Sequence, residues 1–400
     1  MSANAVPPND VPPVDVPPVD HRRLGRELDI FDSNPLIGAG LPFWLPAGAA
    51  ARYEIESYLR ELERQAGYQY VYSPPMAMSA DDELELRPTM CPHHALIFAS
   101  RPRSYRDLPV RIAEMGGQYR AERSGVLGGL GRVRAMSLND AHNFCALDSV
   151  GDEIASILAL VREAHAAVGI DVIGFRLSRR GDGDKYAGDP DMWLRAEAML
   201  RDALDRAGVA YVEAPGEAAF YGPKIDIQVL DPVERESTIS TIQLDFYQPE
   251  QFDLSYVDAS GGRSRPVMVH RSLVGSMERL FAYLIEAHRG AFPVWYSPVQ
   301  LVAVPVADDE VAAADDVVRN AVAAGLRAEV DGQGSVGARV RNASLRKVPY
   351  VAVIGAREAA DGYVSLRLRD GRQLDPMPSA DAIALIARIS ASRSHDLLPI

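Results

Sequence analysis

The sequence predicts a larger domain of mixed helices and strands, followed by a small α/β domain. With 400 residues and a hydrophobic composition of 47%, the chain is long enough for two or three hydrophobic cores. The pattern of apolar residues also changes near residue 297, where strands and helices begin to alternate regularly. We therefore expect an arm over 1–20, a larger domain over 21–296 and a small domain over 297–400.

The expected arm contains the short repeat VPPNDVPPVDVPPVD at residues 6–20. Proline has no backbone N–H group to donate, and the repeat offers few apolar side chains to bury. We expect an extended, disordered segment without a catalytic role.

The first elements of the larger domain are an amphipathic helix and a short strand. Residues 51–67 carry apolar side chains at helical spacing, and YQYVYSPP at 68–75 is rich in β-forming residues. The two prolines that end this stretch favour an edge strand. Two further helices are predicted over 152–167 and 191–207, the second closed by Gly208.

In the small domain, apolar strand segments are separated by helical segments. The strand segments are VQLVAVPV, LRAEV, PYVAVIG and YVSLRLR, and a last helix begins at Asp381. Strands that alternate with helices in this way are typical of an α/β layer with a largely buried sheet.

The composition indicates the cellular compartment in which the protein is expected. Only two cysteines occur, which is typical of a reducing compartment, and no apolar run is long enough to cross a membrane. We expect a cytoplasmic protein without a membrane partner. The net charge of −13 argues against nucleic-acid binding over the whole surface, so any such contact must be local.

Several charged residues in the middle of the chain suggest an anion site. Arg120 and Glu122 are spaced to share one face of a strand, and the glycine-rich VLGGLGRVRAM that follows carries Arg132. Arg279 is expected near the start of a helix. For any one Arg–Glu pair, a structural ion pair is the simpler interpretation.

The conjunction of these segments resembles one family. Residues 87–145 resemble motif 2 of the class II aminoacyl-tRNA synthetases, specifically of the threonyl type, and VMVHRSLVGSMERL at 267–280 resembles motif 3. Residues 68–75 are similar to the dimer segment called motif 1. The resemblance runs from about Asp20 to about Arg393. It implies an α+β catalytic domain, in which an antiparallel sheet of six or seven strands is flanked by helices, and a homodimer.

The resemblance also implies roles in ATP binding. It assigns the α-phosphate and the substrate carboxylate to Arg120, the adenine amino group to Glu122, the γ-phosphate to Arg132, and the phosphates from the other side to Arg279. These charges would stabilise an in-line displacement at the α-phosphorus, assisted by Mg²⁺. Asp140 would orient the substrate amine, and Tyr221, Lys224 and Gln243 would line the pocket.

A zinc site is implied at Cys91, His142 and His270. These are one soft and two borderline ligands, and three protein ligands leave a position open for substrate. Their spacing alone forms no local metal motif and favours structural roles. In the threonyl family the matching residues hold Zn²⁺, which takes the amino and hydroxyl groups of the substrate. The neighbouring His93 and His94 are expected to bind no metal.

The small domain resembles the anticodon-binding domain of the same family. Between Arg339 and Arg372 it carries eight basic and three acidic side chains, a local excess that could bind RNA. Glu358 and Arg367 match positions that contact anticodon bases, although a solvated charged face remains the alternative.

The function implied is ATP-dependent ligation of threonine to tRNA(Thr). The resemblance includes no editing domain, so we expect no editing of serine in cis. Met136, Leu138 and Thr238 depart from the family pattern around the pocket and leave two alternatives open. One is a specialised paralogue that activates a β-hydroxy amino acid in a biosynthetic or resistance role. The other is a regulator that binds RNA without catalysis.

Overall fold

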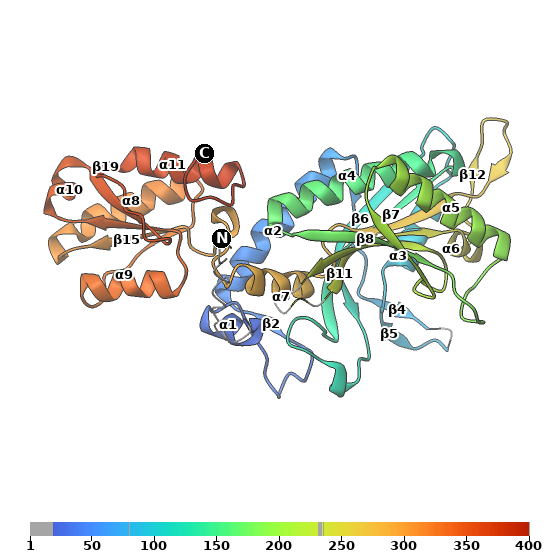
Figure 1. The fold of residues 1–400 in the computed structure, drawn as a ribbon, viewed down its shortest axis with the longest axis horizontal. Helices are drawn as coiled ribbons and strands as arrows, with labels where there is room; N and C mark the ends of the chain where they lie inside the picture. Colours follow the sequence, from blue (N-terminus) through green and yellow to red (C-terminus); the bar gives the residue numbers. More distant parts are fainter. Residues whose placement is uncertain (1–18, 80, 231–233, 235, 400) are drawn as a thin grey trace, which may run out of the picture.

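The computed structural model describes residues 19–79, 81–230, 234 and 236–399, which form two folded units (Figure 1). The arm expected over 1–20 falls outside these residues except for its last two. Asp20 caps helix α1 (His21–Glu27) by accepting a hydrogen bond from the backbone of Arg22. Within the described ranges, no helix is long and apolar enough to cross a membrane.

The larger unit is built on a sheet of eight strands in the order β3-β6-β7-β14-β11-β10-β8-β9. The strands are β3 (Gln69–Tyr70), β6 (Val110–Tyr119), β7 (Ala135–Cys145), β8 (Val172–Arg179), β9 (Tyr211–Pro215), β10 (Lys224–Leu230), β11 (Glu236–Asp245) and β14 (Val267–Ser272). The inner pairs are antiparallel, whereas the edge strands β3 and β9 run parallel to their neighbours. The six inner strands confirm the expected antiparallel sheet, and a short parallel strand is added at each edge.

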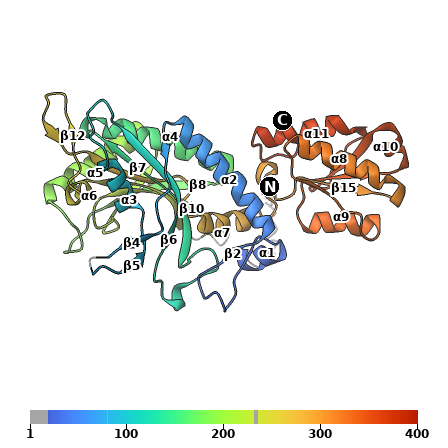
Figure 2. The same cartoon turned by 180° about the vertical axis from the view of Figure 1, so that it is seen from behind.

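Helices cover one face of this sheet. They are α2 (Pro46–Gln65), α4 (Val150–Val168), α5 (Pro190–Arg206) and α7 (Met277–Ala287). In Figures 1 and 2, α4 is seen above the sheet, and α2 runs obliquely beside it toward the smaller unit. Their apolar sides form the main core with the sheet. The three predicted helices match α2, α4 and α5. Helix α2 begins earlier than predicted because Pro46 is well suited to the first turn of a helix.

Within the described part of the chain, helical cover on the opposite face is confined to one end. There α3 (Cys91–Ala99) packs on Ile112, Phe144 and Met268. The hairpin of β4 (Met76–Met78) and β5 (Leu84–Leu86) and the loop 120–134 project from this side of the sheet (Figure 1). The rest of the face stays open and carries polar side chains.

Short elements complete the larger unit. They are β1 (Phe31–Asp32), β2 (Phe43–Trp44), η1 (Ser124–Val126), η2 (Leu147–Ser149), α6 (Tyr247–Gln251), β12 (Tyr256–Val257) and β13 (Arg263–Ser264). The segment that contains β1 and β2 supports the loop 120–134, because the backbone N–H of Arg134 donates to Gly40 O at 2.7 Å.

The smaller unit holds a five-stranded sheet in the order β16-β15-β17-β18-β19. Its elements are β15 (Leu301–Pro305), η4 (Asp308–Glu310), α8 (Val311–Ala323), β16 (Ala328–Val330), α9 (Val336–Leu345), β17 (Tyr350–Ile354), α10 (Ala356–Asp361), β18 (Tyr363–Leu368), β19 (Met377–Pro378) and α11 (Ser379–Ala391). The strand–helix alternation was predicted, whereas α10 and β19 were not, because both are too short to show a period.

The two units meet at the end of α4 and at η3 (Val294–Tyr296). Trp295 Nε1 donates to Ala167 O at 3.1 Å, and Tyr296 Oη donates to Val168 O at 2.9 Å. An ion pair of 2.7 Å between Arg327 and Glu54 joins the smaller unit to α2. These contacts hold η3 and the smaller unit against the larger unit.

Candidate active site

The open face of the large sheet carries a row of polar residues that are distant in sequence. Cross-strand pairing sets His142 opposite His270, His270 opposite Gln243, and Gln243 opposite Lys224. Because side chains two residues apart share a face, Asp140 lies on the same side as His142. Four neighbouring strands thus bring residues from three sequence segments to one surface.

This surface forms the floor of a pocket of about 220 Å³. Among the predicted site residues, its lining includes Cys91, Arg120, Asp140, Tyr221, Gln243, His270 and Arg279. Met136, Leu138 and Thr238, at which the sequence departs from the family pattern, line it as well. His142 lies behind the lining, and Glu122, Arg132 and Lys224 are outside it.

At one end of the pocket, the three predicted zinc ligands come together. Donor atoms of Cys91, His142 and His270 all lie within 4.8 Å of one another, and all three residues are buried. Cys91 Sγ is 3.4 Å from His270 Nδ1. Helix α3 supplies the cysteine and the adjacent strands β7 and β14 supply the histidines.

Hydrogen bonds leave one ring nitrogen of each histidine available as a metal ligand. The Nε2 atom of His142 is buried and has no hydrogen-bond partner among the described residues. Burial and the charge of His270 hold the pKa of His142 well below its usual value, so its ring is neutral. His270 Nε2 donates to Asp245 Oδ2 at 2.8 Å, which leaves Nδ1 toward Cys91.

The electrostatics of this end favour a cation. Burial alone would lower the pKa of His270, but the charges of Cys91 and Asp245 raise it to about 10. A thiolate with two imidazoles is also the donor set that a divalent zinc ion prefers. The residues therefore fit Zn²⁺, and zinc binding itself stays a prediction.

Beside the triad, Asp140 faces the pocket with a carboxylate that no described side chain neutralises directly. Burial raises the pKa of Asp140, while the charges of His270 and Arg271 act in the opposite direction. A substrate ammonium group would pair with such a carboxylate. Tyr221 stacks on His270 with ring centroids 5.0 Å apart and donates from its hydroxyl to Gln243 Oε1.

Arginines converge at the other end of the pocket. Arg279 lies in the first turn of α7, where the side chain of Ser276 caps the helix. Partial burial and the nearby charges of Arg120 and Arg132 lower the pKa of Arg279. Mutual repulsion among guanidinium groups at a helix N-terminus favours the binding of a polyanion.

Two predicted placements at this end differ from the structure. Strand β6 ends at Tyr119, so Arg120 and Glu122 lie in the loop after the strand and not on its face. Glu122 also pairs with Arg132 at 2.9 Å. The carboxylate expected to hold the adenine amino group therefore neutralises the arginine expected to hold the γ-phosphate, because both lie on the same exposed hairpin.

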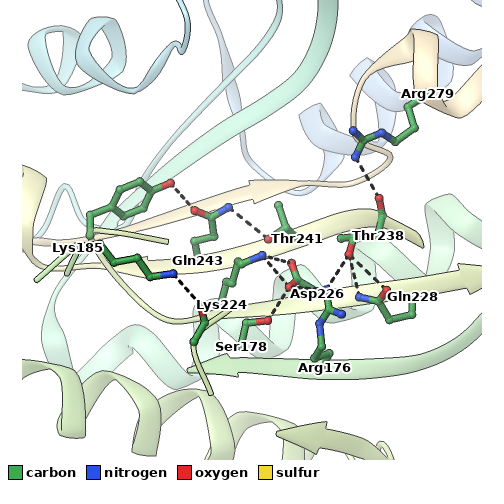
Figure 3. A network of polar contacts seen from close by, with 12 residues as sticks. Arg176, Ser178, Lys185, Lys224, Asp226, Gln228, Thr238, Thr241, Gln243 and Arg279 are labelled. Carbon is green, nitrogen blue, oxygen red and sulfur yellow. Dashed lines mark hydrogen bonds and ion pairs between the residues drawn. The ribbon is translucent and has the colours of Figure 1, made fainter. Parts of the chain in front are cut away.

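A polar network beside the pocket was missed by the sequence analysis (Figure 3). Lys224 Nζ lies 2.8 Å from Asp226 Oδ2, which also accepts from Ser178 Oγ at 2.7 Å. Thr238 Oγ1 accepts from Gln228 at 2.9 Å, and the Thr238 carbonyl accepts from Arg279 at 3.4 Å. Lys224 is therefore held by Asp226, away from the pocket lining. The alternating polar residues of KIDIQVL were the available signal.

In the smaller unit, Glu358 and Arg367 belong to neighbouring elements. Glu358 closes the first turn of α10 by accepting from Gly355 N at 3.2 Å, and it accepts from Ser365 Oγ at 3.0 Å. Ser365 and Arg367 are two residues apart on β18 and share a face. One surface can therefore present both predicted anticodon contacts.

The basic excess between Arg339 and Arg372 is only partly available for RNA. Arg339 is buried and donates to Pro305 O and Gly332 O, so its role is structural. Arg346 pairs with Glu329, and Arg372 pairs with Asp370. The predicted RNA-binding surface is therefore smaller and includes only the remaining exposed cations, such as Arg367.

Comparisons with known proteins agree with this architecture. Residues 75–288 match the tRNA synthetase class II core domain (G, H, P, S and T), and residues 300–389 match the anticodon binding domain. The chain is similar to the threonine–tRNA ligase of Geobacillus kaustophilus, with 43% identity over 394 residues, 92% of this chain and 60% of the relative. That of Levilactobacillus brevis is 44% identical over 406 residues, 94% of this chain and 63% of the relative. The chain thus spans about three fifths of the length of these relatives.

Solved structures extend the comparison. A structure described as the RNA binding domain of threonyl-tRNA synthetase from Cryptosporidium parvum has a TM-score of 0.88 and 32% identity. The similarity covers 92% of this chain and 98% of that one. Prolyl-tRNA synthetase from the same organism, with a TM-score of 0.69 and 14% identity, shares the fold. The core-domain match over more than half of the chain and the nearly complete match to the first structure show that the chain belongs to the threonyl-tRNA synthetases of class II.

Proposed function

We propose that the chain activates threonine with ATP and transfers it to tRNA(Thr). The observation that carries the proposal is one pocket with two chemically different ends, a buried Cys–His–His triad and a group of arginines. An amino acid with a side-chain hydroxyl suits the first end, and a nucleoside triphosphate suits the second. The names of the relatives support the choice of threonine and its tRNA.

In the activation step, the threonine carboxylate attacks the α-phosphorus of ATP and pyrophosphate leaves. The attacking group is already an anion, so no general base is needed. Arg120 and Arg279, which flank the pocket, would stabilise the charge on the phosphates, and Mg²⁺ would arrive with ATP. In the second step, a hydroxyl of the terminal tRNA ribose attacks the carbonyl carbon of the adenylate, and AMP leaves.

Asp140 would hold the ammonium group of threonine, so that the carboxylate points toward the arginines. Cys91, His142 and His270 would hold Zn²⁺, which would bind the substrate amino and hydroxyl groups and so select a β-hydroxy amino acid. Tyr221 and Gln243 would restrict the space around the substrate, because they are joined by a hydrogen bond.

The exposed hairpin β4–β5 supports the proposal of a homodimer. Its apolar residues are largely exposed: Met76 at 41%, Met78 at 59%, Leu84 at 67% and Leu86 at 52%. A contiguous apolar surface of this kind is typical of a protein interface. Sedimentation of the chain and of Met78→Asp would test this, with a monomeric parent chain as the contradicting result.

Two further parts of the proposal concern partners and location. The surface with Glu358 and Arg367 would contact the anticodon of tRNA(Thr). The low cysteine content, with both cysteines reduced and buried, supports action in the cytoplasm.

The test is a pair of assays on the purified chain. Threonine-dependent exchange of pyrophosphate into ATP measures the first step, and charging of total tRNA measures the second. We expect both to proceed, with tRNA(Thr) as the acceptor. Activation of threonine without charging of any tRNA would contradict the proposal and favour a paralogue that loads another acceptor. Absence of both would favour a non-catalytic regulator.

A further inference from the structure

His94 is a fully buried histidine for which the sequence analysis found no role. It follows Cys91 by three residues on α3 and lies between a predicted metal ligand and a carboxylate. His94 Nδ1 is 2.7 Å from His142 Nδ1, and His94 Nε2 is 3.2 Å from Glu114 Oε2. It therefore connects the triad to Glu114 on β6.

The hydrogen bonds determine which nitrogen atoms carry protons. The carboxylate of Glu114 can only accept, so His94 Nε2 must donate to it. With His94 neutral, its Nδ1 accepts, and His142 Nδ1 donates the proton of their shared hydrogen bond. The proton of neutral His142 is thereby held on Nδ1. A lone pair remains on His142 Nε2, the buried atom without a described partner.

Glu114 is itself held firmly in place. It accepts from Ser73 N at 3.2 Å, from Ser73 Oγ at 2.6 Å and from Arg87 Nη2 at 3.1 Å. Arg87 also donates to Gly117 O at 2.8 Å. A Cβ atom on Gly116 would lie 2.1 Å from Met90 Sδ and 2.7 Å from Arg87 Nη2, so any larger residue there would have to displace one of these side chains.

The two histidines of the triad are thus supported differently. His270 donates directly to Asp245, whereas His142 reaches its carboxylate only through His94. In both cases a carboxylate fixes the tautomer of a ligand, and such partners tune metal affinity although they do not contact the metal.

We propose that His94 and Glu114 form a relay that positions His142 as a metal ligand, with Ser73 and Arg87 as its anchor. The inference rests on the proposed zinc site and extends it to residues that contact neither metal nor substrate. It makes the metal affinity of the triad depend on the segment that flanks the exposed hairpin β4–β5, because Ser73 and Arg87 lie on either side of it.

The test compares metal binding by the whole chain and by three variants. His94→Leu removes the acceptor for His142. His94→Asn keeps an amide oxygen near the position of Nδ1. His93→Leu changes the neighbouring histidine, which takes no part in the relay, and serves as the matched control. Zinc content and zinc affinity by chelator competition are measured, together with the visible spectrum of the Co²⁺-loaded chain.

We expect His94→Leu to weaken zinc binding by about 10–100-fold and to alter the Co²⁺ spectrum. His94→Asn should recover part of the affinity, and His93→Leu should match the parent chain. Parent-like affinity and spectrum in His94→Leu would overturn the relay while leaving the zinc site in place. A parent chain that binds no zinc would overturn the proposed zinc site and the relay with it, whereas charging activity would still be judged separately.

Discussion

The two ends of the pocket are built in opposite ways. At the metal end, Cys91, His142 and His270 are buried on a helix and two central strands, and each histidine has a defined hydrogen-bond partner. At the phosphate end, Arg120 and Arg132 are exposed on a loop, and Arg132 forms an ion pair with Glu122.

The difference suits what each end would bind under the proposed function. A metal ligand set must keep its geometry without the ion, and a sheet with paired registers provides that rigidity. A nucleotide is large and must enter and leave, so part of its charge stabilisation lies on a loop that can rearrange. We infer that the metal end is preorganised and that the Glu122–Arg132 pair must separate when ATP binds.

The largest loss of activity is expected from a substitution in the Cys91–His142–His270 triad at the metal end. Cys91→Ala should abolish zinc binding and lower threonine-dependent pyrophosphate exchange by about 10⁴-fold, because the hydroxyl of the substrate loses its partner. Cys145→Ala, which removes the other buried cysteine, is the control and should retain zinc. Full activity in a zinc-free Cys91→Ala chain would show that the triad does not select the substrate.

Substitutions of arginines at the phosphate end should lower the pyrophosphate-exchange rate by a smaller factor. Arg279→Ala and Arg120→Ala should each lower the exchange rate by about 10²–10³-fold, because each removes one charge that stabilises the transition state. Zinc content should be unchanged in both.

Arg279→Lys should recover little activity, because an ammonium group lacks the bidentate geometry of guanidinium. Arg123→Ala removes another arginine of the loop 120–134 and provides a control. Loss of zinc from any of these variants would contradict the independence of the two ends.

Substrate choice tests the comparison further, because the proposed zinc site would recognise a hydroxyl and not a methyl group. Serine carries the same hydroxyl and should be activated only about 10–200-fold less efficiently than threonine. Valine, which lacks the hydroxyl, should be rejected far more strongly. Pyrophosphate exchange with each amino acid measures both ratios. A preference for threonine over serine above about a thousandfold would require a methyl-specific contact, with Leu138 or Met136 as candidates.

The smallest effect concerns the ion pair on the loop. Glu122→Gln should change the free energy of unfolding by less than about 1 kcal/mol, because the pair with Arg132 is exposed to solvent. The KM for ATP should rise while zinc content stays constant. Denaturant unfolding and steady-state kinetics measure the two effects. A destabilisation of several kcal/mol would show that the pair is structural and would argue against its separation on ATP binding.

Much of the local structure could be predicted from the sequence. The period of apolar residues identified α2, α4 and α5, and the alternation after residue 297 predicted the α/β layer of the smaller unit. The edge strand expected within residues 68–75 is confirmed as β3, whereas α10 was too short to give a periodic signal. Arg120 was assigned to a strand that ends one residue earlier, because strand ends depend on pairing with a partner strand.

The sequence alone determined which residue types were available, and its family resemblance indicated which of them to combine. Only the tertiary structure decided their neighbours. Pairing of β7, β14, β11 and β10 set His142, His270, Gln243 and Lys224 in one row, which no spacing along the chain reveals. The same folding set Glu122 against Arg132 and His94 between His142 and Glu114. Such contacts depend on strand register and helix packing, which bring together residues far apart in the chain.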